Sequence, residues 1–241
     1  NSFAGLANKQ VADKVSKVCV AYSGMERYFP KEKIVFTGNP VRKDILSAES
    51  KRDQALAHFA FDANVKTLLI IGGSLGARTI NESIIAGIDK LVDANIQVIW
   101  QIGKGYFDSY KEKLASYDLR KIRVQDFVKE MDLAYAAADV VISRSGALAV
   151  SELCIARKPC ILVPSPNVAE DHQTKNAMAL VKEEAALMIT DKEAGEKLVD
   201  EALKLLFDEQ RAIKLQQQIA TLARPNATQD IVNEIEKLIT K

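Results

Sequence analysis

The order of apolar and polar positions along the chain alternates between two periodicities. Short, nearly continuous apolar segments are typical of buried strands, and between them apolar residues recur every three or four positions, as in amphipathic helices. Beyond residue 44 this pattern predicts strands at 66–71, 95–101, 121–126, 139–143, 159–163 and 186–189. It predicts helices at 50–60, 77–93, 107–117, 129–137, 147–156, 171–184, 191–207 and 209–222.

This alternation of strands and helices indicates an α/β fold with a doubly wound parallel sheet, because parallel strands are joined by helices that cover both faces. Ligands of such sheets bind outside the carboxyl ends of the strands. We therefore expect the functional residues in the loops that follow the strands.

The two ends of the chain differ from this repeating pattern. A helix at 4–15 and short strands at 18–23 and 33–38 come before the turn signal Gly38-Asn39-Pro40. Proline fixes its own φ and biases the preceding residue away from helix, which places a domain boundary near residues 38–44. Pro225 interrupts the last helical region, so we expect a separate terminal helix after it.

A glycine-rich loop follows the strand at 66–71, in the sequence TLLIIGGSLGARTIN. Gly72 and Gly73 lack the Cβ that would keep a ligand from the backbone, and Ser74 adds a hydroxyl donor. The pattern predicts a diphosphate-sized group at the N-terminus of the next helix. Weaker versions recur at 140–152 and 160–173, and the three loops together favour a nucleotide-sugar site.

Other interpretations of the glycine loop differ in strength. It does not spell GxGxxG, and the strand at 95–101 ends without the acid that holds an adenosine ribose, which argues against NAD. It also lacks the GxxxxGK[ST] pattern of nucleotide triphosphatases. Gly72 to Gly76 does match GxSxG, so a hydrolase with Ser74 as nucleophile and His172 as base stays open. A tight glycine turn without a ligand also stays open.

The second loop, Ser143 to Gly146, opens a predicted helix that carries Glu152. A carboxylate there can accept both hydroxyls of a ribose, while the first amides of the helix, at Ala147 and Leu148, face a phosphate or sugar. The alternative is that Ser145 caps the helix and Glu152 is exposed on its surface.

The third loop is followed by His172, Gln173 and Asn176. Amide side chains suit the recognition of sugar hydroxyls, since each offers a donor and an acceptor. A fourth loop contains Phe127 and Val128, where an aromatic ring and a free backbone would flank a base. Packing of Phe127 in the core is the alternative.

Composition excludes several classes of partner. Lys and Arg total 33 against 32 for Asp and Glu, so no net field attracts nucleic acid, and we expect no nucleic-acid partner.

Cys19, Cys154 and Cys160 lie in apolar segments without metal-ligand spacing, which predicts buried thiols in a reducing compartment. No apolar run or leader resembles a membrane span or a signal peptide, so we expect a cytosolic chain. Because it begins at Asn1, we interpret it as a fragment.

Taken in order, several motifs resemble those of the MurG glycosyltransferases, which add N-acetylglucosamine to the membrane-bound muramoyl-pentapeptide precursor of peptidoglycan. The resemblance spans essentially the whole chain. The motifs are NSFAGLANK, GNPVR, GGSLGAR, DFVKEM, ADVVISRSGALAVSEL and DHQTKNA.

The resemblance implies the GT-B architecture, in which two Rossmann-like domains face a cleft. Residues 1–40 would be the C-terminal remnant of the acceptor domain, 41–223 the Rossmann-like donor domain, and 224–241 a helix crossing back to the acceptor domain. The catalytic base and the membrane-binding patch of the family would lie in the missing N-terminal part. We therefore expect no catalytic residue in this chain and no activity of the chain alone.

The resemblance also implies roles for individual residues. Ser74 with its flanking amides, Gly73 included, would bind the UDP diphosphate with Arg42 nearby, and Glu152 would bind the ribose. Val128 would bond uracil through its backbone. Further substrate-binding candidates are Asn1, Met131, Ser145, Ala147, Leu148, Gln173 and Asn176. His172 stands where some relatives have glutamine, so the resemblance supports a sugar contact of His172 less strongly than one of Gln173.

The implied activity is inverting transfer of N-acetylglucosamine from UDP-N-acetylglucosamine to undecaprenyl-pyrophosphoryl-N-acetylmuramyl-pentapeptide, at the cytoplasmic face of the bacterial inner membrane. We expect no metal cofactor, since no loop carries a DxD-like pair. Two alternatives of different kind are a UDP-N-acetylglucosamine epimerase of similar architecture and a nucleotide-sugar sensor without turnover.

Overall fold

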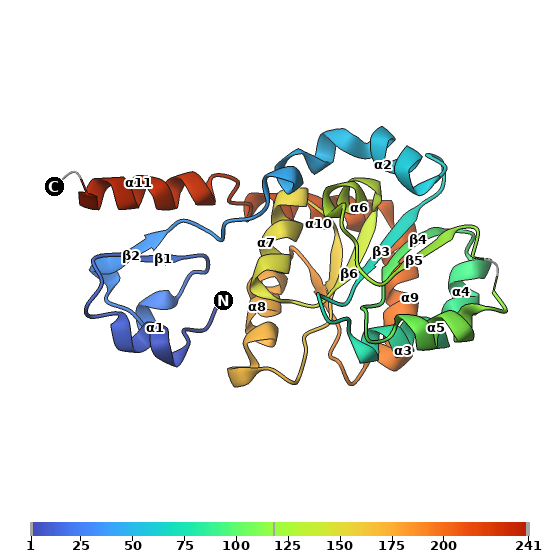
Figure 1. Cartoon of the computed structure of the whole chain (residues 1–241), viewed down its shortest axis with the longest axis horizontal. Helices are drawn as coiled ribbons and strands as arrows, with labels where there is room; N and C mark the ends of the chain where they lie inside the picture. The colour runs from blue at the N-terminus through green and yellow to red at the C-terminus, as the bar shows by residue number, and fades with distance from the viewer. Residues whose placement is uncertain (1, 118, 240–241) are drawn as a thin grey trace.

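The computed structural model describes residues 2–117 and 119–239, and a six-stranded sheet with its helices forms the larger part (Figure 1). The strands are β3 (Thr67–Ile71), β4 (Gln97–Gln101), β5 (Ile122–Gln125), β6 (Val140–Ser143), β7 (Cys160–Leu162) and β8 (Leu187–Met188). They lie in the order β5-β4-β3-β6-β7-β8, and every neighbouring pair is parallel. This is the strand order of a doubly wound Rossmann-type sheet, so the predicted fold class is confirmed.

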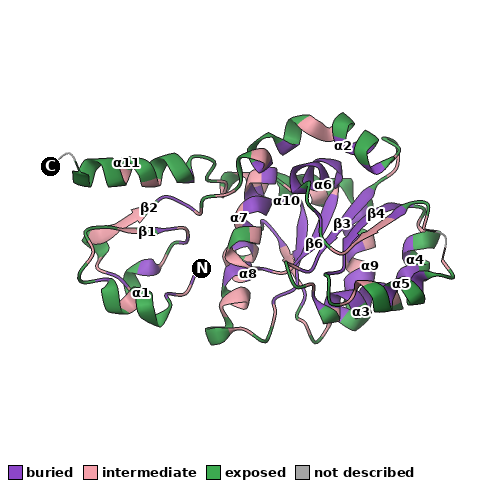
Figure 2. Ribbon diagram, viewed as in Figure 1, coloured by how far each residue is buried: buried purple, intermediate pink, exposed green. Residues whose placement is uncertain are grey.

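Helices cover both faces of this sheet. On one face lie α2 (Arg52–Phe59), α6 (Met131–Ala137), α7 (Ala147–Ala156) and α8 (His172–Val181); on the other lie α3 (Arg78–Ala86), α4 (Ile88–Asp93), α5 (Phe107–Leu114) and α9 (Ala194–Phe207). The next helix, α10 (Glu209–Thr221), contacts α7 and α9. Successive strand residues point to opposite faces, so Leu69 packs in the first core and Leu68 in the second. Figure 2 shows β3, β4 and β6 as the buried centre of the large sheet.

The N-terminal residues form a small separate unit beside the large sheet. It consists of α1 (Leu6–Val11) and two parallel strands, β1 (Val18–Val20) and β2 (Ile34–Phe36), with the 3-10 turns η1 (Met25–Arg27) and η2 (Lys31–Lys33) between them. The last helix, α11 (Ala227–Ile239), leaves the large sheet and lies on the side of this unit (Figure 1). The division of the chain at residues 40 and 224 stays our proposal.

Some elements differ from those predicted. The helix expected at 77–93 is two helices that meet at Gly87, where an added Cβ would lie 2.6 Å from Val199 Cγ2 of α9. A 3-10 helix, η3 (Lys43–Lys51), precedes α2. Before α8, the turn η4 (Ala169–Asp171) contains two residues with positive φ, so the expected helix at 171–184 begins one residue later.

The cysteine prediction is correct for two of the three residues. Cys154 and Cys160 are buried, whereas Cys19 is exposed. Neighbouring residues of a strand point to opposite sides, so with Val20 in the small core Cys19 points away from it. Among the described residues, no helix is both long and apolar enough to cross a bilayer.

Candidate functional site

The three loops singled out in the sequence line one cleft at the carboxyl edge of the large sheet. Its volume is about 650 Å³, and its walls include Gly72 to Thr79 after β3, Ser143 at the end of β6 with Arg144 and Gly146 after it, and Ser165, Asn167 and Gln173 after β7. The central strands β3 and β6 lie side by side where the chain order of the sheet reverses. This is the switch point at which doubly wound folds bind ligands.

The glycines of the loop after β3 serve two different purposes. A Cβ on Gly72 would lie 2.5 Å from the nitrogen of Ala77, and one on Gly76 would lie 2.1 Å from the carbonyl oxygen of Ile102, so the fold itself requires both. Gly73 has φ +83° but nothing within 4 Å of an added Cβ, which leaves its outer side open. Of these three glycines, only Gly73 therefore combines a left-handed backbone with space for a ligand.

Two helices begin at the cleft with free amides. Ala77 is the N-cap of α3 and Gly146 is the N-cap of α7, and in the described chain neither has a side-chain cap. The first N–H groups of a helix lack intrahelical acceptors and carry the positive end of its dipole. The cleft thus presents donors and partial positive charge to an anion such as a diphosphate.

Two predicted residues hold the loops together and do not line the cleft. Ser145 is fully buried and its hydroxyl donates to the carbonyl of Gln173 at 2.9 Å. Asn176 is also fully buried; its Nδ2 donates to the Ser145 carbonyl at 3.0 Å and its Oδ1 accepts from the Ser2 backbone at 2.9 Å. The alternative that Ser145 caps α7 is wrong, since Gly146 occupies that position.

Gln173 lines the cleft with one end of its amide already used. Its Oε1 accepts a hydrogen bond from the Ser165 backbone at 2.9 Å, which leaves Nε2 to donate to a ligand. His172 is not among the cleft residues, and its Nδ1 lies 2.8 Å from the Ala169 carbonyl oxygen. This contact gives no support to the hypothesis of a hydrolase in which His172 is the base for a Ser74 nucleophile. Ser74 is exposed on the glycine loop.

Glu152 is buried on α7, one turn beyond the cleft, with 8% of its surface exposed. The alternative of a surface carboxylate is therefore wrong. The Tyr135 hydroxyl donates to its Oε2 at 3.2 Å, and Arg42 Nε lies 3.9 Å from its Oε1. Burial raises the pKa of Glu152 above its usual value, while Arg42 and the Tyr135 hydrogen bond oppose the rise.

Three predicted positions lie near the start of α6. Val128 is 2% exposed, and none of the hydrogen bonds between described residues engages its backbone N–H or carbonyl. Met131 is buried at the first turn of α6. Phe127 is 43% exposed, so the alternative of core packing is wrong for that residue.

The remaining candidates are placed as follows. Ala147 is partly buried and Leu148 is 50% exposed in the first turn of α7, while Arg42 is exposed at the start of η3, next to Asp44. Asn1 lies outside the described residues.

One ion pair at the cleft was not predicted from the sequence. It joins the loop after β6 to the residues that follow β8. Arg144 donates to the Val163 carbonyl at 3.0 Å and pairs with Asp191, and Thr79 of α3 donates to the same Asp191 at 2.8 Å. Arg144 stands beside Ser145 in a recognised motif, but no sequence signal points to its partner.

The described part of the chain holds no group of three or more His, Cys, Asp and Glu side chains that could bind a metal ion.

A model of the glycosyltransferase family 28 C-terminal domain matches residues 67–235. The chain belongs to this family. It is 53% identical over 241 residues to the UDP-N-acetylglucosamine--N-acetylmuramyl-(pentapeptide) pyrophosphoryl-undecaprenol N-acetylglucosamine transferase of Parabacteroides distasonis, covering 100% of this chain and 66% of that protein. The enzyme of the same name from Cytophaga hutchinsonii is 52% identical over 239 residues, with 99% and 64% covered. The chain thus spans slightly less than two thirds of these relatives.

Solved structures agree with this assignment. MurG of Acinetobacter baumannii superposes with a TM-score of 0.76 at 29% identity, over 98% of this chain and 65% of that one. A UDP-GlcNAc 2-epimerase from Neisseria meningitidis superposes with a TM-score of 0.60 at 16% identity, over 88% and 57%; at that identity only the fold is shared. The resemblance to the MurG glycosyltransferases is confirmed.

Proposed function

We propose that this chain is the donor-binding part of an inverting N-acetylglucosaminyltransferase that converts undecaprenyl-pyrophosphoryl-N-acetylmuramyl-pentapeptide into lipid II in peptidoglycan synthesis. The observation that carries the proposal is the 53% identity to such a transferase along the entire chain. The cleft supports the choice of donor, because it combines a glycine loop with two free helix N-termini, and a buried carboxylate, Glu152, lies one turn beyond it on α7.

In the proposed complex, the diphosphate of UDP-N-acetylglucosamine lies on the open side of Gly73 and Ser74, with Arg42 supplying a positive charge. Glu152 accepts the ribose hydroxyls. The backbone of Val128 meets the edge of the uracil ring, since its N–H and carbonyl are otherwise unused among the described residues. Gln173 donates through Nε2 to a sugar hydroxyl or phosphate oxygen, with Ala147 and Leu148 beside it.

Other candidates support the site indirectly in this proposal. Ser145 and Asn176 fix the loops that carry Gln173 and α7. Met131 sets the position of Val128 from the first turn of α6. Asn1 is proposed as a donor contact on the strength of the family motif alone.

The reaction is attack of an acceptor hydroxyl on the anomeric carbon, with inversion and departure of UDP. A base must take the proton of that hydroxyl, and we place this base in a part of the protein outside this chain. The task proposed here is stabilisation of the departing UDP. Amides and helix dipoles fixed before the reaction do this without reorganising as charge develops.

We further propose that donor binding needs no metal and that the acceptor is reached at the cytoplasmic face of the inner membrane, where another part of the protein supplies the membrane contact. Titration of UDP-N-acetylglucosamine in EDTA tests the first point. A dissociation constant that falls only when Mg²⁺ or Mn²⁺ is added would contradict it.

Isothermal titration with UDP-N-acetylglucosamine tests the donor site directly. Hydrogen bonds to a charged group contribute about 1.5–3 kcal/mol, so Glu152→Ala should weaken binding at least about tenfold. The exposed Glu49→Ala is the matched control and should bind like wild type. Equal affinity of Glu152→Ala and wild type would remove the ribose assignment.

The competing epimerase is separated by a different measurement. Epimerisation needs no acceptor, so incubation with donor alone, followed by chromatography of the sugar, should return UDP-N-acetylglucosamine unchanged. Conversion to an epimer in that experiment would replace the transferase proposal.

A further inference from the structure

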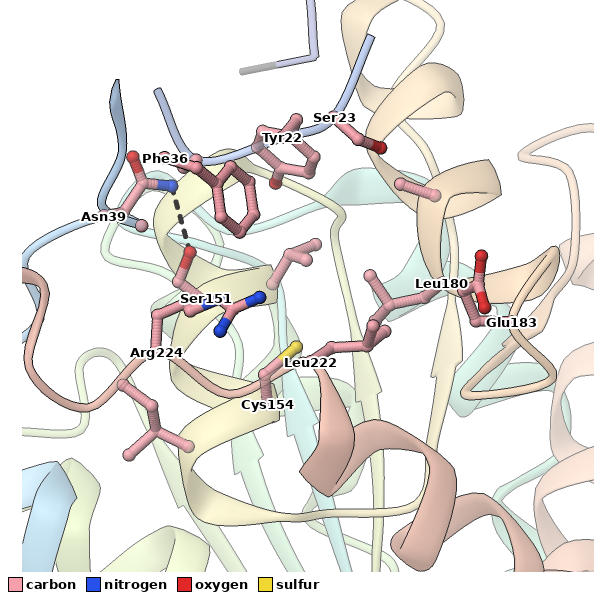
Figure 3. Close-up of a pocket in the computed structure, with 15 residues that line it drawn as sticks. Tyr22, Ser23, Phe36, Asn39, Ser151, Cys154, Leu180, Glu183, Leu222 and Arg224 are labelled. Carbon is pink, nitrogen blue, oxygen red and sulfur yellow. Dashed lines mark hydrogen bonds between the residues drawn. The ribbon is translucent and has the colours of Figure 1, made fainter. Parts of the chain in front are cut away.

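A second cavity lies apart from the cleft, where the small N-terminal unit meets the large domain (Figure 3). Its volume is about 130 Å³. On one side are Tyr22 and Phe36 of the N-terminal unit, and on the other are Cys154 of α7, Leu180 of α8 and Leu222 after α10. We call this cavity the seam pocket. It is close in size to an engineered apolar cavity of about 150 Å³ that binds benzene.

Tyr22 presents an unpaired hydroxyl to this pocket. The residue is 8% exposed and packs in the core of the large domain, yet its buried hydroxyl has no hydrogen-bond partner among the described residues. Burial raises the pKa of Tyr22, and burial raises the pKa of Cys154 to about 12, so both groups stay protonated at neutral pH. The hydroxyl is therefore a donor without an acceptor, which is unfavourable in a buried site.

The remaining walls of the pocket combine aliphatic side chains with the polar residues Ser23, Asn39 and Ser151, and they suit an uncharged ligand with an apolar body. Val150, Ile155 and Leu180 line it with aliphatic side chains. Arg224 and Glu183 also line it, with opposite charges, so the pocket favours neither an anion nor a cation. The Arg224 guanidinium stacks over Phe36, 4.7 Å from its ring centroid.

We propose that the seam pocket binds a neutral molecule the size of an aromatic ring that carries one hydrogen-bond acceptor, and that this acceptor meets the Tyr22 hydroxyl. Such a ligand would contact both sides of the seam, which Asn39 Nδ2 and Ser151 Oγ already join by a hydrogen bond of 2.9 Å. The walls of the seam pocket include Val150 and Cys154 of α7. The same helix carries Glu152, so a ligand in the pocket would contact a helix of the proposed donor site.

Titration of the 241-residue chain with acetophenone and with toluene tests the proposal. Both probes fill the pocket, but only acetophenone accepts a hydrogen bond. A buried hydrogen bond of ordinary strength corresponds to about fivefold in affinity, so acetophenone should bind Tyr22→Phe about fivefold more weakly than wild type. Toluene should bind both equally, and Tyr28→Phe, in the same N-terminal unit, should bind acetophenone like wild type.

Two further measurements establish the location. Tyr22→Phe removes an unpaired polar group, so it should fold at least as well as wild type, and a thermal melt checks this. Ala179→Leu, which fills the pocket from α8, should abolish acetophenone binding. Equal acetophenone affinity of wild type and Tyr22→Phe, or a crystal of the complex with the ring elsewhere or only water beside Tyr22, would overturn the proposal.

Discussion

At the scale of single residues, Glu152 lies in an environment that departs from what its chemistry favours. A carboxylate is costly to bury, and this one has a tyrosine donor at 3.2 Å and an arginine at 3.9 Å as its neighbours. Tyr135, the donor, is itself fully buried, and burial raises its pKa so that it remains a donor. The protein thus keeps an acceptor ready at a position where packing alone would favour an apolar residue.

This environment predicts a pH-dependent effect of Glu152→Gln. Because the folded pKa is raised above the usual 4.5, the native state holds the proton more tightly than the unfolded state. The stabilisation from that proton is complete below pH 4.5 and is lost as pH rises through the folded pKa. Glutamine does not titrate, so the melting temperature of the variant minus that of wild type should increase from pH 4.5 to pH 8.

Glu193→Gln is the control of opposite sign. Hydrogen bonds from Lys197 and Thr190 lower the pKa of Glu193 to about 2. The charged carboxylate therefore stabilises the native state above the pKa of the unfolded chain, and this stabilisation disappears as pH falls. The decrease in melting temperature caused by Glu193→Gln should accordingly grow as pH rises from 2 to 5. Melting differences that are flat with pH for Glu152→Gln would contradict the interpretation of its burial.

The sequence allowed several residues of the site to be predicted, and it did so where the signal was local. Gly73 and Ser74 follow a strand directly, and their loop does line the cleft. Side-chain direction was not predictable, and for that reason the burial of Ser145 and Asn176 was missed. The Arg144–Asp191 pair joins residues 47 apart in the chain, and one sequence gives no signal for such a contact.

At the scale of elements, the periodicities located every strand of the large sheet, because the strands are apolar runs or, in β5, alternate apolar with polar residues. Breaks within helical stretches were harder to predict. The split at Gly87 depends on the approach of α9, and η3 keeps an apolar pattern without α-helical geometry. Both depend on tertiary packing, which overrides local preference.

The glycine loop yields a prediction that separates fold from function. Gly76→Ala places a Cβ 2.1 Å from the Ile102 carbonyl oxygen, so the free energy of unfolding should fall by about 3 kcal/mol or more. Gly73→Ala meets no atoms but has positive φ, so it should cost about 1–2 kcal/mol while weakening donor binding. Urea denaturation and donor titration measure the two effects.

Gly195→Ala is the matched control for both variants. It lies in the first turn of α9 with nothing within 4 Å of an added Cβ, and alanine favours a helix by about 0.5–1 kcal/mol over glycine. It should be slightly stabilised and bind donor normally. Similar losses of stability in Gly73→Ala and Gly76→Ala would contradict the interpretation that the fold requires Gly76 and that Gly73 mainly leaves space for the donor.

At the scale of the whole molecule, the chain passes twice between the small unit and the large domain, and the two passages touch. Gly38 lies in the first, after β2, and Arg224 in the second, before α11. A Cβ on Gly38 would lie 2.5 Å from Arg224 Cβ and 3.3 Å from Ala227 Cβ. The position of α11 therefore depends on a glycine nearly two hundred residues earlier.

Gly38→Ala should loosen α11 while leaving the large sheet intact. The added methyl group displaces Arg224, and the residue also has φ +87°, which alanine disfavours. Limited proteolysis should remove the residues after Arg224 several times faster than in wild type. Gly5→Ala, which meets nothing within 4 Å and has no positive φ, should be cut at the wild-type rate. Equal rates for all three proteins would show that this contact does not hold α11 in place.

The exposure of Cys19 has a practical consequence for labelling the native chain. The other two cysteines are buried in the large domain, and burial raises the pKa of each thiol, which suppresses the reactive thiolate. A maleimide dye would thus attach at one place in the native chain without any cysteine having to be removed. That place is on β1 in the small N-terminal unit, so the emission of the dye would report a change in the surroundings of that unit.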